Sequence, residues 1–235
     1  MTGGDERPAA ALGDWTSPDV GRERPILLVP LGSTEQHGPH LPLDTDTRIA
    51  VALCHRVAAV ATVGVVVAPA VAYGASGEHH GFPGTLSIGQ DALAAVVTEL
   101  GRSAGSDYRL VVFVNGHGGN AEALAGAIAT LEGEGRPVRS WSPTVRDGGG
   151  DSHAGRVETS VVLALAPELV RWERAEVGVT APLGELMAQL REGGLRAVTA
   201  NGVLGDPAGA SAEEGERLLA AWVADLSVAI TDASV

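Results

Sequence analysis

The chain has 235 residues, enough for one well-buried domain and short for two. Its formal net charge is -13, from 29 acidic and 16 basic residues, and every basic residue is arginine. So acidic a surface argues against a nucleic-acid partner, and the lack of lysine excludes Schiff-base and P-loop lysine chemistry. A single cysteine, Cys54, excludes a disulfide framework and a cysteine zinc site.

Residues 1–24 are rich in glycine, proline and charge, and they lack the basic and apolar regions of a secretory signal. No apolar run in the chain reaches the roughly 18 residues of a membrane span. We therefore expect a cytoplasmic protein with no membrane partner. Its first 24 residues should form a poorly ordered leader, and residues 25–235 a single domain.

Strands and helices are predicted to alternate from residue 25 to residue 165. Short continuous apolar runs predict strands at 26–31, 63–68 and 110–114, and a shorter fourth strand is expected near 138–141, after Arg136-Pro137. Helical spacing of apolar residues predicts helices at 46–61, 90–102, 120–134 and 157–165, a short helix within 181–201 and a long one at 211–232. This order predicts an α/β protein, a three-layer α/β/α sandwich around a mostly parallel central sheet.

The segment between the first strand and the first helix, VPLGSTEQHGPHLPLDTDT at 29–47, is dense in polar side chains. Glu35, His37, His40, Asp44 and Asp46 fall within twelve residues, and each needs water, a partner or a metal once it is buried. Glu35 and His37, two residues apart, point the same way in an extended chain, and the two oxygens of Asp46 can bridge two cations. Such nitrogen and oxygen ligands suit Zn, Mn or Fe(II). The alternative is a polar loop with surface histidines.

His117 is the best further candidate for a metal ligand. It lies in NGHGGN, directly after the predicted strand at 110–114, where open α/β sheets place their ligands. Asn115 and Asn120, on either side of it, are candidates for substrate binding. So are Glu78 and His79 in the glycine-rich loop at 69–86, although simple solvent-exposed polarity explains those two about as well.

His153 and Glu158 are the candidate catalytic residues. They flank the start of the helix predicted at 157–165, so both can face one crevice. Two cations would share a water molecule, lower its pKa and polarise a scissile carbonyl. An acid must then protonate the leaving nitrogen, and we expect His153 to be that donor.

The string GSTEQHGPHLPLDTDT resembles the signature of the creatininase family of metal-dependent amidohydrolases. GEHHGFPGT (77–85), NGHGGN (115–120) and HAGRVETS (153–160) resemble further blocks of that family, in the same order. The resemblance covers most of residues 25–165. It implies the α/β/α fold, a homo-hexamer and two divalent metal ions per subunit, with Glu35 and His117 on one ion, His37 on the other and Asp46 on both.

One position departs from the family pattern. Creatininase itself has a glutamate two residues after the histidine of NGH, where this chain has Gly119. The second ion is therefore one carboxylate short. We expect Glu158 to be the replacement metal ligand, with general base as its alternative role and an ordinary glutamate of a helix N-terminus as the third reading. The departure also puts creatinine in doubt as the substrate.

Within the family, the stretches GSTEQHGPHLPLDTDTRIA, APAVAYGASGEH and GVLGDP look most like the mycofactocin-system branch. Its members are peptidases that release the modified C-terminal dipeptide from a ribosomally made precursor peptide, so a peptide substrate is expected. One alternative is an amidohydrolase for a small cyclic amide, and another is a non-catalytic metal- or peptide-binding partner in a biosynthetic assembly. A serine hydrolase is disfavoured, because the G-x-S-x-G match at 101–105 follows a predicted helix, whereas the nucleophile elbow follows a strand.

Overall fold

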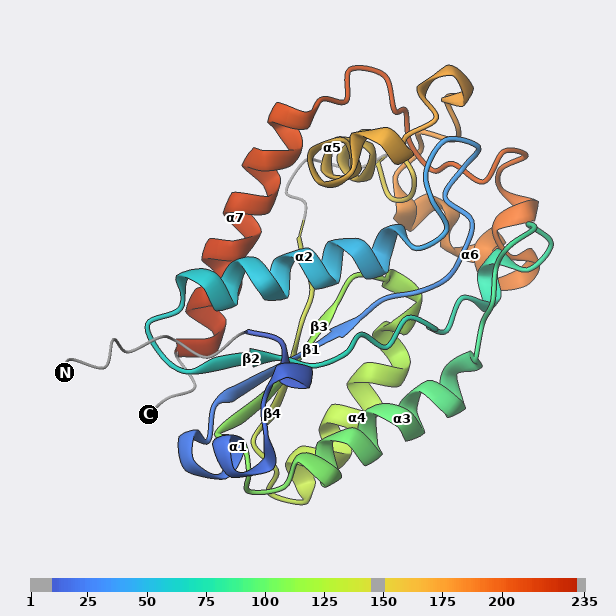
Figure 1. Ribbon diagram of the computed structural model, residues 1–235. Coiled ribbons are helices and arrows are strands. Elements are labelled where there is room, and N and C mark those ends of the chain that lie inside the picture. The colour runs from blue at the N-terminus through green and yellow to red at the C-terminus, as the bar shows by residue number, and fades with distance from the viewer. Residues whose placement is uncertain (1–9, 145–150, 232–235) are drawn as a thin grey trace.

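A computed structural model describes residues 10–144 and 151–231 of the chain. Its centre is a parallel sheet of four strands in the order β2-β1-β3-β4 (Figure 1). The strands are β1 (Ile26–Leu31), β2 (Val65–Val67), β3 (Leu110–Asn115) and β4 (Val138–Trp141). In β1, Ile26 pairs with Val65 on one side and with Leu110 on the other. All four strands lie where the sequence predicted them.

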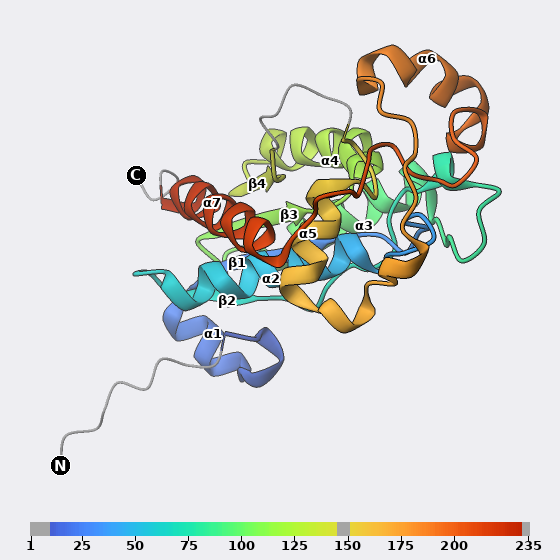
Figure 2. The ribbon, with the colours of Figure 1, turned by 90° about the horizontal axis from the view of Figure 1, so that it is seen from above.

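Helices cover both faces of this sheet, which confirms the predicted three-layer sandwich (Figures 1 and 2). One face carries α2 (Thr45–Val60), α5 (Arg156–Leu165) and α7 (Ala212–Thr231), and the other carries α3 (Gly89–Ala104) and α4 (Ala121–Gly133). Because side chains of a strand alternate between faces, Leu28 packs in the core of the first layer and Leu27 in that of the second. A run that is apolar at every position, such as ILLVPL, can therefore form a central strand of the sheet that is buried on both faces.

Residues 10–24 differ from the irregular leader expected from the sequence. They form the short helix η1 (Leu12–Asp14) and α1 (Ser17–Glu23). Leu12 and Trp15 pack against the core beneath α3 and α4, so apolar contacts hold this segment to the domain. Residues 1–9 lie outside the described part of the chain.

The remaining helices lie in connections, two of them between strands of the sheet and the others between α5 and α7. They are η2 (Gly77–His79), η3 (Gly118–Asn120), η4 (Pro167–Leu169), η5 (Trp172–Arg174), α6 (Leu183–Gly193) and η6 (Leu195–Ala197). Across the described residues, none of the helices combines the length and the apolar character needed to cross a membrane.

The site is built at the carboxyl edge of the sheet. Strands of a parallel sheet all end at the same edge, so the segments that leave β1, β2, β3 and β4 meet there. A late segment also reaches this edge, because Leu204 forms an antiparallel bridge with His153. Polar residues far apart in the sequence are thereby brought to one place.

Candidate metal centre and active site

Glu35, His37, Asp46 and His117 converge as the sequence predicted. The carboxylate of Asp46, in the first turn of α2, lies between two imidazoles: Oδ1 is 3.0 Å from Nε2 of His37, and Oδ2 is 3.2 Å from Nδ1 of His117. Nε2 of His117 is in turn 3.2 Å from Oε2 of Glu35. All four side chains are buried. One carboxylate with an imidazole on each oxygen is the arrangement expected of a bridging ligand.

His153 and Glu158 lie beside this group, on the side of His37. Oε2 of Glu158 is 3.8 Å from Nε2 of His37 and accepts a hydrogen bond of 2.6 Å from the backbone N–H of Ala154. The rings of His37 and His153 are 4.4 Å apart between centroids. His37, His153 and Glu158 thus form a second set of ligand atoms within 4.8 Å of one another, next to the set of Glu35, Asp46 and His117.

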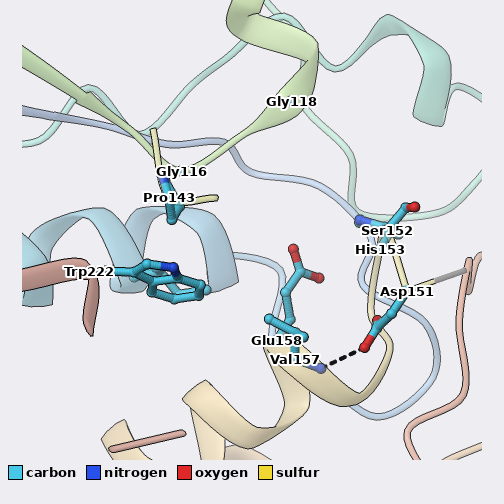
Figure 3. A pocket seen from close by; sticks show the side chains of 10 residues that line it. Gly116, Gly118, Pro143, Asp151, Ser152, His153, Val157, Glu158 and Trp222 are labelled. Atoms are coloured by element: carbon cyan, nitrogen blue, oxygen red, sulfur yellow. Dashed lines mark hydrogen bonds between the residues drawn. The ribbon is translucent and has the colours of Figure 1, made fainter. Parts of the chain in front are cut away.

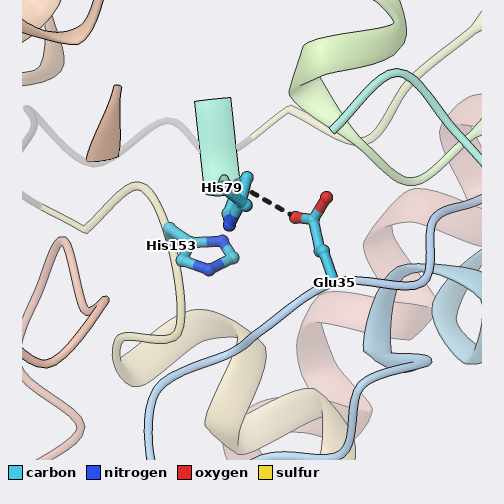
Figure 4. A group of neighbouring side chains, drawn as sticks. All are labelled: Glu35, His79 and His153. Carbon is cyan, nitrogen blue, oxygen red and sulfur yellow. Dashed lines mark ion pairs between the residues drawn. The ribbon is translucent and has the colours of Figure 1, made fainter. Parts of the chain in front are cut away.

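His79 joins the centre, which goes beyond the substrate contact predicted for it. It ends the short helix η2, it is buried, and its Nε2 lies 3.2 Å from Oε1 of Glu35 (Figure 4). Its ring is 4.7 Å from that of His153, and Glu35, His79 and His153 make a third close group. Glu78, its neighbour, also turns inward, and its Oε1 lies 3.4 Å from Nε2 of His117.

Asn115 and Asn120 hold the framework of the site, which differs from the substrate contacts expected of them. The amide of Asn115 donates to the backbone oxygen of His117. The amide of Asn120 accepts from the backbone N–H of Ala75 and donates to the oxygens of Gly32 and Asn115. Asn120 is also the residue before α4, but its side chain makes no capping bond there. Both residues are buried and bonded to protein.

Two other polar residues of the dense segment lie outside the centre. His40 is buried against Thr159, with 2.9 Å between Nε2 and the hydroxyl oxygen, and burial lowers its pKa to about 4. Asp44 pairs with Arg48 at 2.7 Å. The G-x-S-x-G match lies almost entirely inside α3, so it lacks the strand and turn that a nucleophile elbow requires.

Sequence reasoning missed Gln36, whose amide reaches several parts of the site. Its Oε1 accepts from the backbone N–H of Gly38, and its Nε2 donates to the oxygen of Gly202. The same Nε2 lies 3.0 Å from Nδ1 of His79 and 3.1 Å from Nε2 of His153. Its place between Glu35 and His37 was the available signal, but its partner Gly202 lies 166 residues further along the chain.

The buried charges require positive partners. Neither oxygen of Glu35 has a hydrogen-bond partner among the described residues, although the side chain is fully buried. Burial by itself lowers the pKa of His37, but the carboxylates of Asp46, Glu158 and Glu35 together raise it to about 10. Burial also lowers the pKa of His117, but the close carboxylates of Asp46, Glu35 and Glu78 raise it well above its usual value. Bound cations would supply the charge that otherwise has to come from imidazolium groups.

The pKa values of Glu158 and His153 are shifted in opposite directions. Burial raises the pKa of Glu158 to about 7, although the charge of His37 acts the other way. Burial, helped by the nearby charges of His37 and His79, holds the pKa of His153 well below its ordinary value. A carboxyl group that titrates near neutrality can carry a proton in either direction. The role of His153 as proton donor stays a prediction.

A cavity of about 180 Å³ opens beside Glu158. The carboxylate of Glu158 points into it, and the indole of Trp222 and Pro143 form an apolar wall (Figure 3). The lining is completed by Ile49, Gly116, Gly118, Asp151, Ser152, His153 and Val157. A substrate seated here would have its reacting group beside the buried carboxylates and imidazoles.

A sequence profile of one family matches nearly the whole chain. The creatininase profile, described as creatinine amidohydrolase, covers residues 13–230. The chain belongs to the creatininase family. It is therefore a hydrolase. Two solved creatininase structures superpose on this chain: one named for Mn, with a TM-score of 0.79, and a mutant of the Zn-Zn type, with a TM-score of 0.78.

Relatives within this family differ in their named substrates. The chain is 54% identical over 219 residues to the mycofactocin precursor peptide peptidase of Mycolicibacterium smegmatis, covering 91% of this chain and 87% of the relative. It is 32% identical over 177 residues to the creatinine amidohydrolase of Pseudomonas putida, covering 63% and 67%. A crystal structure of creatinine amidohydrolase superposes with a TM-score of 0.78 at 28% identity, covering 95% of this chain and 97% of that one.

Proposed function

We propose that this creatininase-family hydrolase is a metal-dependent peptidase that releases the modified C-terminal dipeptide of a mycofactocin precursor peptide. Support for the substrate is the 54% identity, over nearly the whole chain, to the Mycolicibacterium smegmatis peptidase of that name. Support for the chemistry is a single observation, the fully buried Glu35 carboxylate with no hydrogen-bond partner among the described residues, set between the imidazoles of His79 and His117. A carboxylate in this position needs a cation.

Two divalent ions, Zn, Fe(II) or Mn, suit the nitrogen and oxygen atoms present. Glu35, Asp46 and His117 would hold one ion, and His37 with Asp46 the other, with His153 and Glu158 beside it. When bound, such ions polarise a carbonyl and supply an activated water. No thiol competes for them, because Cys54 is buried in the core against α5 and α7.

Glu158 is assigned the proton transfers of the reaction. Its carboxylate points into the cavity, and a pKa raised by burial to about 7 lets it take a proton from water and pass it to the leaving nitrogen. The backbone N–H of Ala154 holds one oxygen in place. Asp151 fixes the start of α5 beneath it, through a hydrogen bond from the backbone N–H of Val157.

How the terminal carboxylate of a peptide is held stays open to test. Arg48 and Arg156 already pair with Asp44 and Glu214 at 2.7 Å. Another arginine of the chain, Arg146, lies outside the described residues. The homo-hexamer and the cytoplasmic location also stay predictions, and light scattering of the purified protein and cell fractionation test them.

The deciding experiment incubates protein reconstituted with Zn or Fe(II) with the modified precursor peptide and follows the peptide by mass spectrometry. Loss of the C-terminal dipeptide, prevented by a chelator and restored by the metal, is the expected result. An intact peptide alongside hydrolysis of a creatinine-like cyclic amide would replace this proposal by a small-molecule amidohydrolase. Peptide binding without turnover by either route would indicate the non-catalytic partner.

A further inference from the structure

Gly119 has no room for a side chain. A Cβ atom there would come closer than 3.0 Å to the carboxylate of Glu78, the ring of His117 and the backbone oxygen of Ala75. Its backbone does not have the positive φ that favours glycine, whereas ten other glycines of the described chain do. Gly118, its neighbour, has open space at the same position. Occupied space, and not backbone conformation, therefore requires glycine at 119.

The carboxylate of Glu78 is one of the groups that fill this space. It comes from η2, a segment that follows β2, and it reaches across to the loop after β3. Its Oε1 is 3.4 Å from Nε2 of His117, and Oε2 of Glu35 approaches the same nitrogen at 3.2 Å. Two carboxylates from different segments thus share one imidazole nitrogen.

We propose that Glu78 is a metal ligand on the His117 side of the centre, an added carboxylate for the ion of Glu35 and His117 that occupies the space a side chain at position 119 would need. The inference rests on the metal centre of the proposed function. Adjacent ligand atoms on one ion are separated by roughly 3.0–3.4 Å when each lies about 2.1 Å from the metal, which is the range of both contacts to His117. The Glu78 side chain is 32% exposed, so it can turn toward an ion without breaking the core.

Glu158 does not fill this role on the same side. It lies 3.8 Å from His37, and one of its oxygens is held by the backbone of Ala154. The two glutamates therefore divide between the two ends of the centre. Glu78 adds negative charge beside His117, and Glu158 stands beside His37 at the cavity.

Metal binding without any peptide tests the proposal. The affinity and stoichiometry of Zn are measured for the ion-free protein by competition with a chromophoric chelator, and the visible spectrum of the Co(II)-loaded protein reports the ligands. Glu78→Gln should weaken one of two ions by more than the about 10–100-fold that losing an outer partner typically costs, and should change the Co(II) spectrum. Glu185→Gln, which removes an exposed carboxylate on α6, should change neither.

A second pair of variants tests the same point without altering Glu78. Gly119→Ala must displace the Glu78 carboxylate, the His117 ring or both, and should weaken the same ion, whereas Gly118→Ala enters open space and should not. Two ions bound by Glu78→Gln with the wild-type affinity and spectrum would overturn the inference, whatever Gly119→Ala does. A wild-type protein that binds two ions but leaves the precursor peptide intact would refute the peptidase proposal and leave this inference standing.

Discussion

Metal binding should control the stability of this protein through Glu35. The carboxylate is fully buried, and neither of its oxygens has a hydrogen-bond partner among the described residues. One ion at 100 times its Kd stabilises the folded state by about 2.7 kcal/mol. A chain of this size gains about 2–4 °C in Tm per kcal/mol, so one ion should raise Tm by roughly 5–11 °C and two by about twice that. Differential scanning calorimetry over a series of free Zn concentrations measures this rise.

The variant Glu35→Gln separates the ion from the rest of the fold. It should lose most of the metal-induced rise in Tm, because its neutral amide is a much weaker ligand. Without metal the change should cost less than it does with metal, because only the pairing of Glu35 with His79 and His117, each at 3.2 Å, is then lost. Glu185→Gln, the surface control, should keep the full rise. If Glu35→Gln were equally destabilised with and without metal, the carboxylate would be a packing element and the argument for a cation would fail.

Three further predictions follow from the same contacts. Glu158→Gln should lower turnover of the peptide by about 10²–10⁴-fold, the usual contribution of a positioned acid or base, while equilibrium dialysis finds its metal content unchanged; loss of an ion would make Glu158 the replacement ligand that the sequence suggested. His37 has a pKa of about 10 in the ion-free protein, so an ion that binds it must displace a proton. The affinity for the ion should therefore rise with pH, and calorimetry in buffers of different ionisation enthalpy should detect proton release on binding. If no proton were released, the raised pKa would be contradicted. Asn120→Ala should lower the free energy of unfolding in urea by about 2–4 kcal/mol, since it leaves buried backbone groups of Ala75 and Gly32 unpaired; a loss below about 0.5 kcal/mol would show that these bonds are replaced.

The layers of the fold could be predicted because the sequence pattern is local. A strand buried on both faces reads as a continuous apolar run, and β1, buried along its whole length, begins and ends where that rule placed it. Alternation with helices then fixes a parallel sheet and brings the strand ends to one edge. Convergence of Glu35, Asp46 and His117 follows from this edge, since each lies just past a strand or at the start of the next helix.

The parts of the site that could not be predicted depend on contacts between loops. Gln36 binds Gly202, and His153 is bridged to Leu204, from a segment that shows no regular pattern of its own. The inward turn of Glu78 depends on the path of a glycine-rich loop. Residues 10–24 looked irregular because their composition is polar, and only two of their apolar side chains, Leu12 and Trp15, tie them to the core.

Hydrogen bonding around His153 leaves two places for its ring hydrogen. The backbone N–H of Gly38 and the backbone oxygen of Gly202 fix the orientation of the Gln36 amide, because the N–H must meet the amide oxygen and the carbonyl oxygen must meet the amide nitrogen. Nε2 of His153 lies 2.9 Å from the backbone oxygen of Gln36, to which an N–H would donate, and 3.1 Å from the amide nitrogen of the same residue, from which a lone pair would accept. Both tautomers of the ring therefore find a partner, and this hydrogen bonding does not exclude His153 as the proton donor. The assignment of proton transfer to Glu158, whose carboxylate faces the cavity, is a proposal that the Glu158→Gln variant tests.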